Sequence, residues 1–330
     1  MKYNFTPKQN LTFYLSKTGN LFHKLYKTPE RKPGISVMIH VKNEEDWIGL
    51  SLQSLKSFAD EVVIVDNGST DRTVEEVKKI QPQLPYNIKL KQNPAGSMCE
   101  ISNQALSLTT YRWVVRWGGD FIAFTTGSRN ISKLRNYLLS LNRNNFYVIY
   151  PLLFNFSYDL FHLRKNKELH SENYIHTFHP LLKYEHKKIF VTLKVPFFFN
   201  VKRVLKIHFV HIGFVKPIEQ LLERYFRHPW DKKEIRDEYP RMIDFIKAKA
   251  KEMWDTDKLK DIIQKIFDEQ KLFIYKYDKE KYGDYPELLK PVLKNQPFKI
   301  LYRNGKPYTR SDIPEFSEEK IDKSSELYQK

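Results

Sequence analysis

The segment from Ile35 to Lys79 constrains the fold of this chain more than any other. β-Branched residues occupy every second position of Ile35–Val41, which predicts a short strand. Apolar residues of Ile48–Leu55 then recur at helical spacing, and a second apolar run, Val62–Val65, ends at Asp66. The pattern predicts two parallel strands joined by a helix, followed by an acidic turn and another helix. This arrangement is typical of nucleotide-binding α/β domains.

Polar residues follow both predicted strands. In parallel sheets, ligands bind in the crevice outside the carboxyl ends of the strands. We therefore expect a ligand-binding crevice here, lined by Val41, Lys42, Asn43, Glu44, Asp66 and Asn67.

Asp66 has a structural interpretation as well. It precedes the sequence NGST, so its carboxylate could accept backbone hydrogen bonds in a tight turn. Gly68 would then adopt a positive φ angle, and Ser69 or Thr70 would cap the next helix.

The chain resembles a known enzyme family from about residue 35 to 141. An apolar strand, the sequence VKNEE, an amphipathic helix and the sequence ADEVVIVDNGSTDRT occur in the order found in the donor-binding half of family 2 glycosyltransferases. The resemblance implies a GT-A fold, a Rossmann-like α/β/α sandwich with a mixed sheet. It also implies an inverting transferase that moves a sugar from a nucleotide-diphosphate donor, with UDP-sugars favoured, to a hydroxyl of a glycan or lipid-linked acceptor.

The sequence YRWVVRWGGDFIAF lies where this family carries its acidic DXD motif. It ends in Asp120, but the first acidic position of the motif is Gly118. One carboxylate, two diphosphate oxygens and water can still complete the shell of Mg²⁺ or Mn²⁺. The resemblance implies that Asp120 binds this metal and that Asp66 and Asn67 contact the nucleotide base.

Two histidines lie in the later segment KIHFVHIGFVK. The part HIGFVK resembles a His-Xaa-Gly segment of the family, which implies His211 as a further metal ligand. His208 is the other candidate. In an extended segment residues three apart point to opposite faces, so both could reach one ion only from a helix. The alternative for either histidine is a packed and hydrogen-bonded role in the core.

An inverting transferase also needs a general base for the acceptor hydroxyl. The sequence offers no clear counterpart, and position alone puts Glu172 and His179 first. Asp159, Glu168 and Glu185 lie in the same region, and each of these residues has a surface or structural role as its alternative.

Composition limits the remaining classes. The single cysteine, Cys99, excludes an internal disulfide and a cysteine-based zinc cluster. The chain shows no apolar run of about 18 residues and no signal-peptide pattern, so we expect a cytoplasmic protein. The net charge of +17 attracts anions, although a composition rich in Lys, Asn, Phe and Tyr can also produce it. No nucleic-acid-binding motif is present, and nucleic acid is not an expected partner.

Basic and apolar residues also gather in two segments that suggest a membrane. Residues 1–33 carry seven Lys and Arg residues against Glu30, with apolar residues near helical spacing. Such a segment can lie on an anionic membrane or pack as a solvated helix on the domain. Phe197–Phe199 are flanked by basic residues, which suggests a lipid-linked or anionic acceptor, with packing in a hairpin as the alternative.

The domain prediction has three parts. A basic segment, 1–33, precedes a GT-A domain, 34–215, with a donor half at 34–141 and an acceptor half at 142–215. A mainly helical region with a polar tail, 216–330, follows. Two alternatives to an enzyme are a non-catalytic nucleotide-sugar-binding protein and a basic membrane-surface module. A nucleotidylyltransferase is excluded because HVKNEE replaces the Gly-rich loop that it needs.

Overall fold

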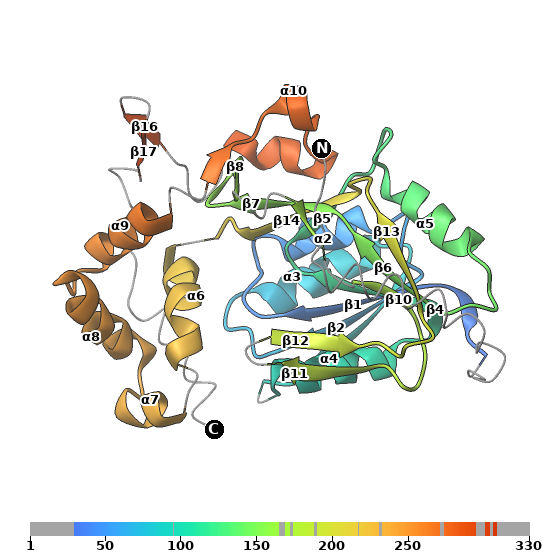
Figure 1. Cartoon of the computed structure of the whole chain (residues 1–330), viewed down its shortest axis with the longest axis horizontal. Coiled ribbons are helices and arrows are strands. Elements are labelled where there is room, and N and C mark those ends of the chain that lie inside the picture. The colour runs from blue at the N-terminus through green and yellow to red at the C-terminus, as the bar shows by residue number, and fades with distance from the viewer. Residues whose placement is uncertain are drawn as a thin grey trace. The chain divides into compact units, whose positions relative to one another are not determined.

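The computed structural model describes residues 30–94, 96–164, 169–171, 174–187, 190–216, 218–230, 233–270, 274–294, 301–303 and 306–308. The chain forms two compact units, which we describe separately (Figure 1). The first unit takes Met1–Phe154, Leu169–His211 and Tyr285–Leu289. The second takes Asn155–Glu168, Ile212–Asp284 and Lys290–Lys330. Each unit is therefore built from segments that are not contiguous in the sequence. The division into three consecutive parts stays a prediction.

A seven-stranded mixed sheet forms the centre of the first unit, in the order β13-β6-β10-β4-β1-β2-β3. Strands β4, β1, β2 and β3 are parallel, and β10 is antiparallel to both β4 and β6. The bounds are β1 Lys32–Val41, β2 Glu61–Asp66, β3 Asn87–Gln92, β4 Tyr111–Gly118, β6 Tyr147–Pro151, β10 Ile175–Thr177 and β13 Asn200–Val204. The expected strand, helix, parallel strand order is confirmed.

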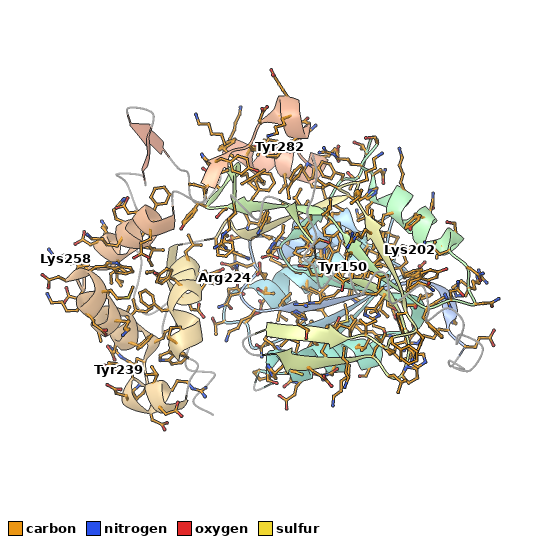
Figure 2. The ribbon with its side chains drawn as sticks, in the orientation of Figure 1. Tyr150, Lys202, Arg224, Tyr239, Lys258 and Tyr282 are labelled. Atoms are coloured by element: carbon orange, nitrogen blue, oxygen red, sulfur yellow. The ribbon has the colours of Figure 1, made fainter. Side chains whose placement is uncertain are left out.

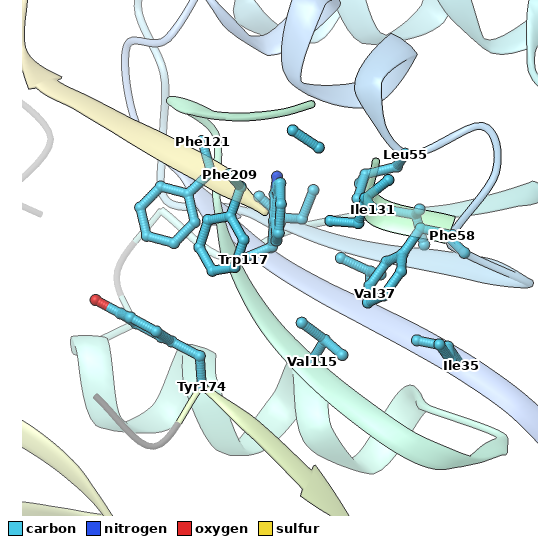
Figure 3. Close-up of a cluster of buried hydrophobic side chains, with 14 of the residues drawn as sticks. Ile35, Val37, Leu55, Phe58, Val115, Trp117, Phe121, Ile131, Tyr174 and Phe209 are labelled. Atoms are coloured by element: carbon cyan, nitrogen blue, oxygen red, sulfur yellow. The ribbon is translucent and has the colours of Figure 1, made fainter. Parts of the chain in front are cut away.

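Helices cover both faces of this sheet. All six residues of β2 are buried, as expected for a parallel strand that is covered on both sides. Helices α2 (Ile48–Ser54), α3 (Thr73–Ile80) and α5 (Ile131–Ser140) share one apolar cluster with the sheet, and Figure 3 shows its part around Trp117. Helix α4 (Met98–Leu108) packs on the other face. The expected α/β class is confirmed.

Local signals account for the helix bounds. Helix α4 starts after Ser97, whose hydroxyl accepts a hydrogen bond from the Glu100 amide while the Glu100 carboxylate accepts one from the Ser97 amide. Asn130 caps α5 by accepting a hydrogen bond from the Ser132 amide. A short 3₁₀ turn, η2 (Gln81–Gln83), follows α3.

Shorter strands complete the first unit. A hairpin, β11 (Lys183–Lys187) and β12 (Phe190–Lys194), packs on α4, where the Asn103 amide donates to the Tyr184 carbonyl. Strand β5 (Phe121–Ala123) is antiparallel to the first residues of β14 (Phe209–Phe214). Residues 147–157 form two strands, β6 and β7 (Leu153–Ser157), because Pro151 has no amide hydrogen with which to extend the ladder.

The second unit is mainly helical, as the spacing of its apolar residues predicted. Its helices are α6 Ile218–Trp230, α7 Lys233–Glu238, α8 Met242–Trp254, α9 Leu259–Gln270 and α10 Lys279–Tyr282. Strands β8 (Asp159–Arg164) and β15 (Ile274–Lys276) pair antiparallel, and β16 (Leu301–Arg303) pairs with β17 (Lys306–Tyr308). The 3₁₀ helix η4 spans Glu287–Lys294, and its first three residues belong to the first unit. Strand β9 (Leu169–His170) also belongs to the first unit.

Aromatic and aliphatic side chains of α6, α8 and α9 form the core of the second unit. Phe226 and Trp230 of α6 pack there with Ile246 of α8 and Phe267 of α9. Arg224, labelled in Figure 2, lies over the Phe214 ring and donates a hydrogen bond to the Gly213 carbonyl. Within the described ranges, no helix is long and apolar enough to cross a membrane.

Candidate active site

Two loops meet at the carboxyl end of the sheet, where the parallel strands β1, β2 and β4 finish. Asn43 has a φ angle of 54°, and its side-chain oxygen accepts a hydrogen bond from the Thr70 amide at 2.8 Å. The Glu44 amide donates to the Thr73 hydroxyl at 2.7 Å, and the Asn67 amide donates to the Val41 carbonyl at 2.9 Å. These bonds bring together the two groups of residues that the sequence placed at one crevice.

Asp66 shapes the turn after β2. Its side chain is buried, and both carboxylate oxygens lie 3.2 Å from the Ser69 amide, while one lies 2.5 Å from the Ser69 hydroxyl. Gly68 has a φ angle of 73°, as the structural interpretation of this turn expected. The first turn of α3 is bound by Asp71, which accepts from the Thr73 amide at 2.9 Å, so the expected cap by Ser69 or Thr70 is wrong.

Asn67 connects this turn to the loop after β3. Its side-chain nitrogen donates to the carbonyls of Asn93, at 3.1 Å, and Gly96, at 3.0 Å. The side chain is buried, so Asn67 fixes the path of the chain from β3 into α4. Lys42 lies half-buried at the end of β1, and Glu44 is buried beside it. The contacts of Asp66 and Asn67 with a nucleotide base stay predictions.

Asp120 and His211 face each other at the end of β4. The side chain of Asp120 is 7% exposed, and one of its carboxylate oxygens lies 3.5 Å from Nε2 of His211. The register of β5 with β14 pairs His211 with Phe121, and the two rings are in contact with centroids 4.9 Å apart. Pairing of two short strands therefore brings the late histidine to the acidic residue.

The extended form of β14 separates the two candidate histidines. His208 precedes this strand, and its Nδ1 lies 2.8 Å from the Arg129 carbonyl and 3.2 Å from the Asn130 carbonyl. Burial lowers the pKa of His208, which favours its neutral form. His211 alone reaches Asp120, and His208 takes the packed, hydrogen-bonded role.

Two glycines allow the backbone to pass close to its neighbours at this site. A Cβ atom on Gly119 would lie 3.0 Å from Val41 Cγ1 and 3.1 Å from Glu44 Cγ, so the ends of β1 and β4 touch here. A Cβ atom on Gly118 would lie 2.6 Å from an Asp120 carboxylate oxygen and 2.7 Å from the Phe121 ring. Any side chain at position 118, an acid included, therefore displaces Asp120 or Phe121.

His40 and Arg116 also lie at this end of the sheet, and the sequence analysis did not select them. His40 is the register partner of Gly118, and burial lowers its pKa to about 3, helped by the charge of Arg116 and opposed by that of Asp120. The Arg116 guanidinium lies 5.9 Å from the ring centroids of both Tyr174 and Tyr184. Strand alternation places His40 and Arg116 on the same face of the sheet, and this pattern could have identified the pair from the sequence.

Glu287, far along the sequence, stabilises the loop after β5. The Glu287 carboxylate accepts hydrogen bonds from the Thr125 amide and hydroxyl, both at 3.0 Å, and from the Thr126 hydroxyl at 2.5 Å. Burial raises the pKa of Glu287, but these hydrogen bonds outweigh it and hold the pKa below its usual value. The segment Tyr285–Leu289 thus fixes the chain that leaves Asp120.

A family model for glycosyl transferase family 2 matches residues 36–205, which is more than half of the chain. The chain belongs to glycosyl transferase family 2. An uncharacterized glycosyltransferase of Rickettsia typhi is 32% identical over 113 residues, covering 32% of this chain and 38% of that protein. The chain therefore spans less than half the length of this curated relative.

Solved glycosyltransferases of low identity resemble parts of the structure. The fragment 1-349 of TarS from S. aureus is 15% identical, with a TM-score of 0.39, covering 84% of this chain and 96% of that one. The mannosyltransferase PcManGT from Pyrobaculum calidifontis, in complex with GDP-Man and Mn²⁺, is 14% identical, with a TM-score of 0.38, covering 68% of this chain and 74% of that one.

Of the two predicted base residues of this family 2 member, the structure describes only His179. Glu172 lies outside the described residues. His179 follows β10, which is antiparallel to β4, so it lies at the amino end of the parallel strands. Its ring packs between Phe146 and Phe198, and its Nδ1 accepts a hydrogen bond from the Leu181 amide at 3.1 Å. The choice of His179 by position alone is therefore not supported.

Two of the other acidic candidates take structural positions. Asp159 is fully buried in the second unit, and one of its oxygens lies 2.6 Å from Nδ1 of His162. Glu185 lies on the exposed hairpin, 3.5 Å from the Lys194 ammonium. Glu168 lies outside the described residues.

The chemistry of Asp120 and His211 fits a divalent cation. No group of three or more His, Cys, Asp or Glu side chains with metal-binding geometry occurs among the residues that the structure describes. A carboxylate oxygen and an imidazole nitrogen are both ligands of Mn²⁺. Their separation of 3.5 Å is long for a hydrogen bond, and two ligands of one ion lie about 3 to 3.5 Å apart. Two protein ligands leave the remaining positions to the diphosphate and water.

Proposed function

We propose that this chain transfers a sugar from a nucleotide-diphosphate donor to a hydroxyl of a glycan or lipid-linked acceptor, with inversion at the anomeric carbon. The observation that carries the proposal is the Asp120 and His211 pair, 3.5 Å apart at the carboxyl end of the sheet. Family 2 membership and the two joined loops beside this pair support it. We infer that Mn²⁺ or Mg²⁺ is required.

The reaction forms one bond and breaks one. The acceptor oxygen bonds to the anomeric carbon, while the bond from that carbon to the diphosphate oxygen breaks and its electron pair stays on the diphosphate. The acceptor proton passes to a base. Negative charge grows on the leaving diphosphate, so the site needs a positive group there. A divalent cation, when bound, supplies this charge.

Asp120 and His211 would hold that cation in this chain. The close approach of Gly119 to Val41 and Glu44 supports a position of the proposed metal ligands next to the predicted nucleotide crevice. Nucleotide and diphosphate can therefore occupy neighbouring parts of one site. Asp66 and Asn67, whose side chains fix the crevice wall, are the proposed contacts of the nucleotide base.

UDP-sugars are the first donors to test. TarS has been solved with UDP-GlcNAc and PcManGT with GDP-Man, so a donor panel needs both nucleotides. Isothermal titration calorimetry with UDP-, GDP- and dTDP-sugars, with and without Mn²⁺, should show metal-dependent binding of one donor. Release of the nucleoside diphosphate in the same mixtures should show metal-dependent hydrolysis.

The alternative functions give different results. Metal-dependent binding with neither hydrolysis nor transfer would identify a non-catalytic nucleotide-sugar-binding protein. No binding of any donor would contradict both proposals. A Glu185→Gln variant is the matched control, because it removes an exposed carboxylate that lies on the hairpin.

A further inference from the structure

Two tight turns in the first unit present large apolar side chains to solvent. Leu181 is 57% exposed and Phe197 is 63% exposed. In the first turn the Leu182 amide donates to the His179 carbonyl at 3.0 Å, and in the second the Phe199 amide donates to the Pro196 carbonyl at 3.2 Å. Both apolar tips therefore belong to ordered backbone turns.

Buried aromatic rings anchor the two turns to each other. His179 of the first turn contacts Phe198 of the second, with ring centroids 5.1 Å apart. Phe146 contacts both, at 5.0 Å from His179 and 5.6 Å from Phe198. Because His179 and Phe198 point inward, Leu181 and Phe197 are the residues that the turns leave outside.

Basic side chains lie next to these tips. Lys183 and Lys194 are direct partners in the register of β11 with β12, and both are exposed. Lys183 is two residues from Leu181, and Lys194 is three residues from Phe197. Glu185 is the acidic neighbour, 3.5 Å from Lys194. We call Leu181, Lys183, Lys194 and Phe197 the hairpin surface.

The N-terminal segment joins the domain at the same end of the sheet. The Arg31 guanidinium lies 3.2 Å from the centroid of the Phe178 ring and donates to the Tyr111 carbonyl at the start of β4. Residues 1–29 precede this point and contain five lysines and no Asp or Glu: Lys2, Lys8, Lys17, Lys24 and Lys27. Arg31, which follows this basic sequence, thus lies at the amino end of the sheet.

We infer that the hairpin surface binds an anionic membrane. Leu181 and Phe197 would enter the headgroup region, and Lys183 and Lys194 would contact lipid phosphates. Charge favours an anionic membrane over two other occupants of the hairpin surface, the segment 1–29 and a second copy of the chain. The segment 1–29 is itself basic, and a second copy of the chain carries a net charge of +17, so each would repel the paired lysines. An anionic surface attracts all of these features together.

The position of the hairpin surface separates membrane binding from the proposed catalysis. Strand β4 has eight residues and therefore spans about 25 Å between the amino end, near Arg31, and Asp120. A membrane at the amino end leaves the donor crevice accessible to solvent. Membrane binding and donor hydrolysis can therefore be lost independently.

Vesicle co-sedimentation of the full chain tests the inference. Phosphatidylcholine vesicles with about 30% phosphatidylserine should bind the protein, and phosphatidylcholine alone should not. A Leu181→Ser, Phe197→Ser variant should bind about tenfold or more weakly, because two apolar side chains lose their insertion. Leu205→Ser is the matched control: Leu205 is 64% exposed but follows β13 at the carboxyl end, and its binding should change less than twofold.

Charge reversal provides the second variant. Lys183→Glu with Lys194→Glu should weaken binding by roughly tenfold, and added salt should remove most of the difference. Unchanged thermal melting and donor hydrolysis would exclude misfolding as the cause.

Three outcomes would overturn the inference. In the first, the wild-type chain does not bind phosphatidylserine vesicles. In the second, both hairpin variants bind as the wild type does, and deletion of residues 1–29 alone abolishes binding. In the third, single-stranded RNA binds the wild type, both hairpin variants lose it, and vesicle binding is unchanged, which would assign the surface to nucleic acid.

Discussion

The two ends of the central sheet use buried carboxylates in different ways. At the amino end, the Glu61 carboxylate accepts hydrogen bonds from the Ser36 hydroxyl and the Thr110 amide, both at 2.5 Å, and pairs with Lys89 at 2.8 Å. At the carboxyl end, Asp120 faces His211 at 3.5 Å. The first carboxylate is surrounded by close donors from three strands or loops and stabilises the fold. The second lies opposite an imidazole nitrogen at a distance that is long for a hydrogen bond, and the two side chains are the proposed metal ligands.

Asp120→Asn should have the largest effect. The amide keeps the shape of the side chain but removes its charge, so the proposed cation loses its anionic protein ligand. Donor turnover should fall by about 10² to 10³, with unchanged melting temperature. Steady-state hydrolysis with saturating Mn²⁺ measures this, and Glu185→Gln serves as the control. Turnover within threefold of wild type would remove Asp120 from the mechanism.

Glu61→Gln should destabilise the protein without affecting the donor site. The neutral amide removes the charge that pairs with the Lys89 ammonium and weakens the hydrogen bonds from Ser36 and Thr110. This loss should lower the free energy of unfolding by about 2 to 3 kcal/mol. Urea denaturation measures this. Glu76→Gln breaks an exposed pair with Lys79 and should cost less than about 0.5 kcal/mol.

The same substitution tests a pH dependence. Burial raises the pKa of Glu61, but hydrogen bonds from Lys89, Ser36 and Thr110 outweigh it and lower the pKa overall. The folded state therefore favours the ionised form. Its stabilisation is present above the ordinary pKa of Glu and is lost as pH falls through the lower folded value. The stability difference between wild type and Glu61→Gln should narrow below about pH 4.3.

His211→Ala should weaken the apparent affinity for Mn²⁺ by about tenfold to 100-fold, because one of two protein ligands is lost. Titration of donor hydrolysis with Mn²⁺ measures it. His208→Ala is the matched comparison, since His208 contacts the carbonyls of Arg129 and Asn130. That variant should melt at a lower temperature and keep its Mn²⁺ affinity. Equal Mn²⁺ dependence in both variants would exclude His211 as a ligand.

Gly118→Asp should have the smallest effect, and a negative one. The substitution restores the first acid of the family motif, but its Cβ would lie 2.6 Å from an Asp120 oxygen. We expect donor turnover to fall by about threefold to tenfold and stability by about 1 to 2 kcal/mol. Gly118→Ala carries the same Cβ without the acid and should behave alike. Higher turnover of the Asp variant would show that the local backbone adjusts and uses the second carboxylate.

Local patterns made the donor half of the fold predictable. Within Ile35–Lys79 the apolar residues change from alternating to helical spacing, and this pattern involves only neighbouring residues. The structure has β1, α2, β2 and α3 in this segment. The capping box of α4 is local as well.

Contacts between distant segments limited the prediction of the site. The approach of His211 to Asp120 depends on the register of β5 with β14, for which the sequence contains no local signal. His179 was selected by position, but the three residues of β10 run antiparallel to β4. His179, which follows β10, therefore lies at the amino end of the parallel strands. The sequence around Asp66 allowed both a contact with the nucleotide base and a structural role in the turn. Its hydrogen bonds with Ser69 became known only from the structure.

The contact of Glu287 with Thr125 has a consequence for the order in which the protein is made. The two residues are 162 positions apart, so the loop after Asp120 receives this partner only after residue 287 has been synthesised. The loops that follow β1 and β2 can assemble much earlier, since domains fold while the chain emerges. A chain that stops before Tyr285 contains both of these loops but lacks the carboxylate that bonds Thr125 and Thr126.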